Sequence, residues 1–458
     1  ANLMLSVVHI GDLPLYSKLY RVGVSSYIGT EGRWPGVCTK ITEPPSPLAC
    51  SATQPGYVQG DPVVVATGDQ VRTESDPLGV SQDSPQIARI YRSTTVRPGS
   101  LGVGWSFDFD RTLETSSGPG DDAFQVYVQG DHGSFVVFTH RSDGAYDQTI
   151  NSGTLTRPNA LGGEFAHRNA SGRIDYFNKI TGSRYRLVSS FSKEGVGQFF
   201  TYDANNHLQT ITDSFGRTWQ VVWNNDYVID SIIGPDVTVQ YQYDLSAISP
   251  GTLIPGTERL TSVLVKDAMG TLLTTRVYHY EDPRNRYFLT GVSDENANRY
   301  ATIAYDDYAK TLSSEHAGGA DRHSFSYPSD TSRTVTDPLG TVRTINITNL
   351  FGFARVTSIS QPGGAGCTPG ASSLTYHDSY LSETLDFNGN KTCYYFDTVR
   401  YLETGRVEGF DAASTCPYLP PNSLTGIQRK ILTQWHPDER VVVKRSAPKS
   451  VSVQSFHL

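Results

Sequence analysis

The sequence predicts an all-β protein built from hairpins that stack side by side. Only 18% of its 458 residues are charged, while Gly (42), Pro (25) and Tyr (26) are plentiful, a balance typical of turn-rich β-proteins. Apolar and polar residues alternate with a period of two in many short segments, most clearly over residues 237–243. Turn-forming pairs such as Asp-Gly, Asn-Gly and Pro-Gly separate these segments. Short strands joined by tight turns are therefore expected along most of the chain.

Composition divides the chain into four parts. Residues 1–55 are irregular and Pro-rich, and residues 56–140 hold denser apolar strands and form a β-rich N-terminal domain. Residues 141–440 form the repetitive part, and residues 441–458 form a basic tail. The best helix candidate, residues 86–97, is rich in β-branched side chains, so we expect a strand there.

The balance of charge excludes some function classes. The chain has 38 basic and 46 acidic side chains, a net charge of -8, which disfavours a nucleic-acid partner. No apolar stretch is long enough to span a bilayer, so no membrane span is expected. Two Met residues in a chain rich in Tyr favour an exported protein over a cytosolic enzyme.

An internal repeat organises the second half of the chain. It consists of an aromatic residue, about ten further residues, and then an acid-x-x-Gly quartet. Ten residues correspond to one strand and a turn, so equivalent positions recur in successive hairpins, with the acid capping the turn and Gly taking positive φ. The repeat positions are Tyr202, Asp213 and Gly216; Tyr305, Glu315 and Gly318; Tyr327, Asp337 and Gly340; and Tyr376, Asp386 and Gly389.

The residues from Tyr202-Asp203 to Gly216-Arg217 resemble the YD repeat of the RHS family. Residues 336–341 and 385–390 resemble the turn half of the same unit. Upstream, Gly60-Asp61-Pro62-Val63 and Leu101-Gly102-Val103-Gly104-Trp105 resemble the domain of unassigned function that opens many bacterial RHS proteins. Together the two resemblances cover residues 60–440, although the irregular intervals leave the number of repeats open.

The resemblance implies a sheet that winds into a partial shell or open spiral, as in bacterial polymorphic toxins. Members of the family enclose a C-terminal cargo, often a toxin, or present a module at the cell surface. After Arg440 the sequence resembles neither the self-cleaving core nor a cargo domain of such proteins. The expected partner is therefore a cargo polypeptide or a further RHS-repeat segment, and the expected location is secreted or at the bacterial cell surface.

No catalytic motif stands out, so we expect a protein that is not an enzyme and that needs no cofactor or metal. The sequence lacks G-x-S-x-G and H-E-x-x-H, and Gly102-Val103-Gly104 lacks the third glycine of a dinucleotide loop. The recurring aspartates are better explained as turn caps than as catalytic carboxylates. An enzyme acting on polysaccharide remains a minor alternative.

The sequence leaves two further questions open, one about disulfides and one about glycans. Cys38 and Cys50 bracket a Pro-rich loop and are the candidate disulfide, whereas Cys367, Cys393 and Cys416 are expected to be structural or incidental thiols. An adhesin is the alternative to a scaffold, with Trp105 and Trp435 as candidate glycan contacts. Trp219 and Trp223 share one strand face and are expected in the core.

Overall fold

The structure is a computed structural model, and it describes most of the chain after residue 57. The described residues are 58–79, 86–95, 98–116, 125–129, 135–141, 144–148, 153–158, 164–224, 227–244, 257–350, 353–363, 369–377, 380–437, 440–447 and 450–453. Apart from one short 3-10 turn at Ala317–Gly319, the regular elements in these ranges are strands, which confirms the predicted all-β class. No helix in the described part of the chain is long and apolar enough to cross a membrane.

A small sheet opens the described chain. Its strand order is β1-β2-β3-β4-β7, and its longest pair, β3 and β4, runs antiparallel from Val71 opposite Arg92 to Pro77 opposite Gln86. The segment proposed as strand rather than helix is thus strand β4. The first strands are β1 (Val58–Gln59), β2 (Val63–Val64), β3 (Asp69–Pro77), β4 (Gln86–Arg92), β5 (Pro98–Gly99), β6 (Gly102–Val103) and β7 (Trp105–Phe107).

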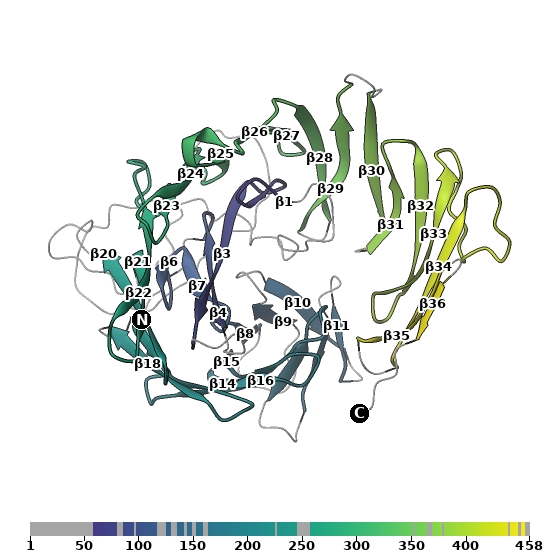
Figure 1. The fold of residues 1–458 in the computed structure, drawn as a ribbon. Coiled ribbons are helices and arrows are strands. Elements are labelled where there is room, and N and C mark those ends of the chain that lie inside the picture. The colour runs from purple at the N-terminus through teal and green to yellow at the C-terminus, as the bar shows by residue number, and fades with distance from the viewer. Residues whose placement is uncertain are drawn as a thin grey trace, which may run out of the picture. The chain divides into compact units, whose positions relative to one another are not determined.

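The remaining strands form one long antiparallel sheet. From β13 onward each strand pairs with the next in chain order, as the colour sequence of Figure 1 allows the reader to follow. Strand β8 pairs with both β9 and β15. The strands leading into the repeats are β8 (Thr112–Thr115), β9 (Gln125–Gln129), β10 (Phe135–His140), β11 (Tyr146–Gln148), β12 (Thr154–Thr156), β13 (Phe165–Arg168), β14 (Ile174–Thr181) and β15 (Arg184–Phe191).

The repeats follow as a meander of hairpins. Their first part comprises β16 (Gly197–Tyr202), β17 (Leu208–Asp213), β18 (Thr218–Asn224), β19 (Val228–Ile233), β20 (Val237–Asp244), β21 (Arg259–Asp267), β22 (Leu272–His279), β23 (Gly291–Ser293), β24 (Arg299–Tyr305), β25 (Thr311–His316) and β26 (His323–Ser329). Their second part comprises β27 (Ser332–Thr336), β28 (Val342–Leu350), β29 (Phe353–Gln361), β30 (Gly370–His377), β31 (Tyr380–Leu385), β32 (Asn390–Asp397), β33 (Leu402–Asp411), β34 (Arg429–Trp435), β35 (Val442–Ala447) and β36 (Ser450–Val453).

Alternation in the sequence corresponds to alternation of burial in the strands. In β20, Val237, Val239 and Tyr241 are buried while the residues between them are half-buried or exposed. In β18, Trp219 and Val221 are buried, and Trp223 packs against the same core. One face of the repeat sheet therefore builds a core, because successive side chains of a strand point to opposite faces.

Candidate functional site: one face of the repeat sheet

A single kind of turn recurs along the sheet, and Asp213 illustrates it. Its Oδ1 accepts hydrogen bonds from the main-chain N–H groups of Phe215 (2.9 Å) and Arg217 (2.9 Å). The Gly216 N–H donates to the Asp213 carbonyl at 3.0 Å, and Gly216 has φ +80°. The same pattern of bonds is built by Asp203, Asp267, Asp294, Asp306, Asp337 and Asp386, and by Asn169.

The assignment of Glu315 to this position is wrong. Glu315 lies within β25 and its carboxylate pairs with Arg322 at 3.2 Å instead of capping main-chain N–H groups. The turn that follows is the short 3-10 segment, in which Gly318 has φ +72°. A glutamate side chain is one methylene longer than an aspartate, so it does not reproduce the short Asx cap.

The repeat aromatics fasten neighbouring strands to one another. Tyr202, at the end of β16, donates its hydroxyl hydrogen bond to the Leu187 carbonyl of β15 at 2.6 Å. Burial raises the pKa of Tyr202 above its usual range, and the charge of Asp110 raises it further. The hydroxyl therefore stays protonated and can donate this hydrogen bond. The same bond to the preceding strand or loop is made by Trp223, Tyr243, Tyr280, Tyr305, Tyr327, Tyr376 and Trp435.

These aromatic residues lie at or just after the ends of β16, β18, β20, β22, β24, β26, β30 and β34, and the acid-x-x-Gly spacing identifies only part of the series. Trp223, Tyr243, Tyr280 and Trp435 were missed because no acid-x-x-Gly quartet follows them at ten residues. An aromatic residue near the end of every second strand is the signal that would have found them.

The N-terminal strands pack on the core-forming face of the repeat sheet. In the main core cluster, Tyr91, Trp105 and Phe107 meet Trp219 and Tyr241 of the repeats. A second cluster joins Val63, Val65 and Ala66 to β26–β29. Leu374 of β30 packs against this second cluster, so the core to which the N-terminal strands contribute reaches as far as β30.

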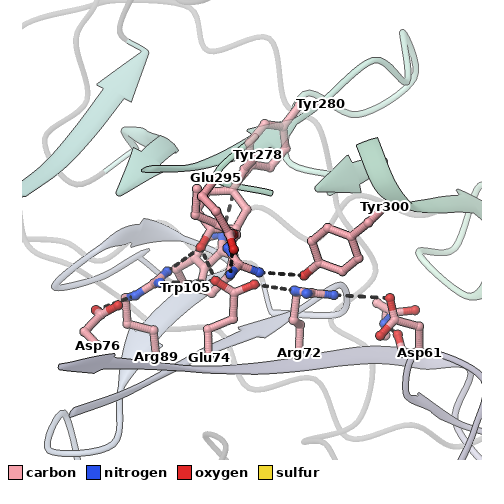
Figure 2. A network of polar contacts seen from close by, with 12 residues as sticks. Asp61, Arg72, Glu74, Asp76, Arg89, Trp105, Tyr278, Tyr280, Glu295 and Tyr300 are labelled. Carbon is pink, nitrogen blue, oxygen red and sulfur yellow. Dashed lines mark hydrogen bonds and ion pairs between the residues drawn. The ribbon is translucent and has the colours of Figure 1, made fainter. Parts of the chain in front are cut away.

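A network of buried ions lies within this contact (Figure 2). The Arg89 guanidinium donates to Asp76 (2.6 Å), to Glu74 (3.1 Å) and to the Tyr278 hydroxyl of β22 (2.7 Å). Arg72 donates to Glu74 at 2.6 Å. Each buried charge has a partner of opposite sign, which is the condition under which ions are tolerated away from water. The network therefore fixes β3 and β4 on the repeat sheet in one register.

The pKa of Glu74 makes this contact sensitive to acid. Burial alone raises the pKa of Glu74, but Arg89 and Arg72 outweigh it and hold the pKa below its usual range. A depressed folded-state pKa gives stability that is present above the unfolded pKa of about 4.3 and is lost as the pH falls through the folded pKa. We expect the free energy of unfolding, measured with urea at several pH values, to decline steadily below about pH 4.3. Glu74→Gln should flatten this decline, and equal slopes in the two proteins would contradict the assignment.

Beyond β30, the same face of the sheet has no such cover among the described residues. Leu374 lies opposite Thr384, Thr384 lies opposite Thr392, and Tyr394 in the same strand lies opposite Arg406. Residues opposite each other in antiparallel strands share a face, so these side chains continue the face that carries Leu374. They are half-buried, and none of them belongs to the two clusters that include the N-terminal strands. Ile431, which lies opposite Arg406 on this face, is buried. We call this part of β31–β35 the open face.

The opposite face is covered there by the chain itself. Cys393, Tyr395, Val407 and Phe410 form a small buried cluster against which Cys416 packs. A disulfide joins Cys393 of β32 to Cys416 of the loop 412–428, with 5.6 Å between the Cα atoms. The expectation that Cys393 and Cys416 are thiols is therefore wrong. The pairing was missed because the two cysteines are 23 positions apart with no motif between them, and only the loop brings them together.

Removing this disulfide should release the loop. We expect the Cys393→Ala/Cys416→Ala variant to lose about 2–3 kcal/mol of stability, because the bridge closes a loop of moderate length. Limited proteolysis should then cut within residues 412–428. Ser414→Ala is the control, since Lys391 Nζ contacts Ser414 through its main-chain carbonyl, which the substitution keeps. Unchanged protease resistance of the double variant would refute the role of the bridge.

The two candidate glycan contacts are differently placed. Trp105 is 1% exposed, and its ring packs 4.8 Å from Tyr278, so the proposal that it stacks on a sugar is wrong. Trp435 is half-buried, and its Nε1–H donates to the Glu403 carbonyl at 2.8 Å. Cys38 and Cys50 lie outside the described residues. No group of three or more His, Cys, Asp or Glu side chains in the described ranges is placed to hold a metal ion.

Comparison with known proteins gives one family match. A model described as a domain of unknown function (DUF6531) matches residues 60–138, the segment from the start of the small sheet to β10. This is well under half of the chain. No curated protein gives a significant match.

Among solved structures, the chain is similar to components of Tc toxins. The Tc holotoxin pore of Photorhabdus luminescens matches at 11% identity and a TM-score of 0.23, covering 83% of this chain and 21% of that chain. A TcdB2-TccC3-Cdc42 structure matches at 9% identity and a TM-score of 0.25, covering 84% and 27%. A porin-like protein from Bacteroides uniformis matches at 10% identity and a TM-score of 0.22, covering 54% and 93%. The chain spans about a quarter of the length of the toxin proteins, and likenesses at these TM-scores carry no argument about fold or function.

Proposed function

We propose that this chain is a non-catalytic scaffold that holds another polypeptide against the open face of β31–β35. The observation that carries the proposal is that the same face, from the first repeats to β30, already holds a polypeptide segment. That segment, the N-terminal strands, is held by an apolar core and by the ions around Arg89. A face with the same hairpin construction and no such cover offers the same kind of contact to a further segment.

The side chains of the open face suit a peptide partner. Thr384 and Thr392 present methyl groups and hydroxyls, and Tyr394 adds an aromatic ring with a polar tip. Arg406 is already paired with Glu403 and Glu408, at 2.8 Å and 2.9 Å, so it adds little net charge. Burial of this surface by a partner provides the stabilising free energy, at about 25 cal/mol per Å² of apolar area.

The recurring carboxylates support a role without catalysis. Burial raises the pKa values of Asp213 and Asp386, but hydrogen bonds from turn N–H groups and a neighbouring side chain outweigh burial and hold these pKa values below their usual range. The hydrogen bond from Arg343 lowers the pKa of Asp337 in the same direction. A general acid needs a pKa raised toward the working pH, which is the opposite shift. Structural caps account for these residues.

The family resemblance and the disulfide make the proposal more specific. In proteins that resemble this one, the enclosed polypeptide is often a toxin, so we propose a cargo of that class or a further repeat segment. The Cys393–Cys416 bridge fits an exported protein, because disulfides persist in oxidising compartments. The alternative function, an adhesin that binds glycans, is weakened because one of its two candidate contacts, Trp105, is buried in the core.

Hydrogen exchange on the full chain tests the proposal. The chain is produced alone and together with the polypeptide encoded directly downstream of it, and amide protection is compared strand by strand. We expect co-purification and increased protection in β31–β35, with β13–β24 unchanged. Failure to co-purify, or protection gained only outside β31–β35, would overturn the proposal.

Matched variants locate the contact. Thr392→Arg places a bulky cation on the open face and should abolish co-purification. Thr375→Arg is the control, because Thr375 is exposed and neighbours Leu374 in β30, so it points to the opposite face. Equal effects of the two variants would show that the open face is not the site.

A further inference from the structure

The turns of the repeat sheet fall on two edges. In an antiparallel meander, successive turns alternate between the edges, so the turns that follow odd-numbered strands from β15 to β33 share one edge. We call this edge the rim. It includes the turns at Asp213, Asp267, Asp337 and Asp386, and the loop 412–428 between β33 and β34.

Among the described turns, large apolar side chains are exposed mainly on the rim. Met269 and Leu339, each the third residue of an Asp turn, are 93% exposed, and Phe215 at the same position is 71% exposed. Tyr418 in the loop 412–428 is 95% exposed. The other large apolar side chains exposed in rim turns are Val196, Phe387, Leu419, Leu424 and Ile427, whereas the described turns of the opposite edge expose Tyr227, Tyr308 and Val399.

The loop 412–428 holds its apolar side chains in a fixed position. It contains no charged residue among its seventeen, in a chain that is 18% charged. The disulfide anchors it at Cys416, and the Lys430 Nζ donates to the Pro421 carbonyl at 2.8 Å. Because the loop is attached at these two points, it is not free to fold Tyr418 into the core, and the ring stays exposed.

We call the exposed apolar side chains at the turns of the rim the tips. The distances between them distinguish a protein partner from a lipid surface. The turns carrying Phe215 and Met269 are two hairpins apart, about 19 Å at the usual strand spacing, and Leu339 is three hairpins further on. Phe215, Met269 and Leu339 at such distances form no contiguous patch for a protein partner, although the loop 412–428 exposes several apolar side chains together. A fluid lipid interface accepts each tip separately, because it needs no matching shape.

We propose that the rim docks on the surface of a lipid bilayer, with Phe215, Met269, Leu339 and Tyr418 inserted at the headgroup boundary. This is contact with a surface and not a crossing of the membrane. The turns that carry three of these tips begin with Asp213, Asp267 and Asp337, and Asp213 and Asp337 are paired with Arg217 (2.7 Å) and Arg343 (2.8 Å), so these turns carry no excess of positive charge. Anionic lipid therefore adds no attraction, and a zwitterionic surface is the preferred one. The inference is independent of whether the open face holds a polypeptide.

Flotation of the full chain with phosphatidylcholine vesicles tests the proposal. We expect the protein to float with these vesicles, and to bind no more tightly when phosphatidylglycerol is mixed into them. Each of Met269→Ser, Leu339→Ser and Tyr418→Ser should lower the partition coefficient by about tenfold, and the triple variant should abolish flotation. Because the replaced side chains are exposed, circular dichroism and thermal unfolding should be unchanged.

Two exposed residues of the opposite edge serve as matched controls. Tyr308→Ser and Val399→Ser replace side chains that are 61% and 81% exposed, and they should leave flotation unchanged. Absence of flotation for the unaltered chain would overturn the proposal, as would equal losses in rim and control variants. Self-association without lipid that Leu339→Ser and Tyr418→Ser abolish would assign the rim to a second copy of the chain instead.

Discussion

Replacing Arg89 by Met should lower the free energy of unfolding by about 3–5 kcal/mol, because the change leaves Asp76 and Glu74 buried beside an uncharged side chain. Arg89 is the ion that links the two carboxylates to Tyr278 of β22, with its three contacts at 2.6–3.1 Å. The loss should be measured by urea unfolding of the full chain near pH 7. We also expect faster hydrogen exchange in β3 and β4, since their attachment to the repeat sheet depends on this network.

An exposed ion pair provides the control for Arg89. Arg141 pairs with Asp147 at 3.3 Å, and both side chains are more than half exposed. Arg141→Met should change the stability by less than about 0.5 kcal/mol, because solvent screens exposed pairs. Comparable losses for the two variants would mean that the buried network does not hold the N-terminal strands in place.

Replacing Gly102 by Ala should cost about 3 kcal/mol or more. Gly102 has φ +84°, a conformation that costs a residue with a Cβ about 1–2 kcal/mol. An added Cβ would also collide with the Glu258 carbonyl oxygen, a main-chain atom that cannot turn aside. Overpacking of this kind typically costs a further 1–3 kcal/mol or so. Gly102 lies opposite Arg259, so the collision would separate β6 from β21.

Gly340 separates the two contributions to this cost. It has nearly the same φ, +82°, but a Cβ added there meets nothing within 4 Å. Gly340→Ala should therefore cost only the conformational part, about 1 kcal/mol. If urea unfolding gives equal losses for the two variants, the close approach between β6 and β21 contributes nothing.

The fold class and the turn chemistry could be predicted from the sequence because both are local. Alternation over residues 237–243 already specifies a strand with one buried face. Asp213 and Gly216 specify their turn within five residues, since the cap and the positive φ are properties of those residues themselves. Spacing alone does not predict the turn, because Glu315 has the matching spacing but its longer side chain does not cap a turn in the same way.

Contacts between distant segments could not be predicted in this way. Arg89 and Tyr278 are 189 residues apart, and no pattern in either neighbourhood points to the other. The Cys393–Cys416 bridge likewise depends on the path of one loop. Trp105 was a candidate glycan contact, whereas the packing of the N-terminal strands on the repeats buries it.

The sequence by itself determined that this chain forms strands, where its hairpins turn, and which residue caps each Asp turn, because those interactions are made within one or two strands. Only the tertiary structure decided which part of the repeat sheet is covered, which face stays open and which turn tips share an edge. Those properties depend on how many hairpins the N-terminal strands reach across and on the order in which the strands pair. The reach of the N-terminal strands and the order of strand pairing depend on contacts between residues far apart in the chain, and local sequence patterns do not encode such contacts.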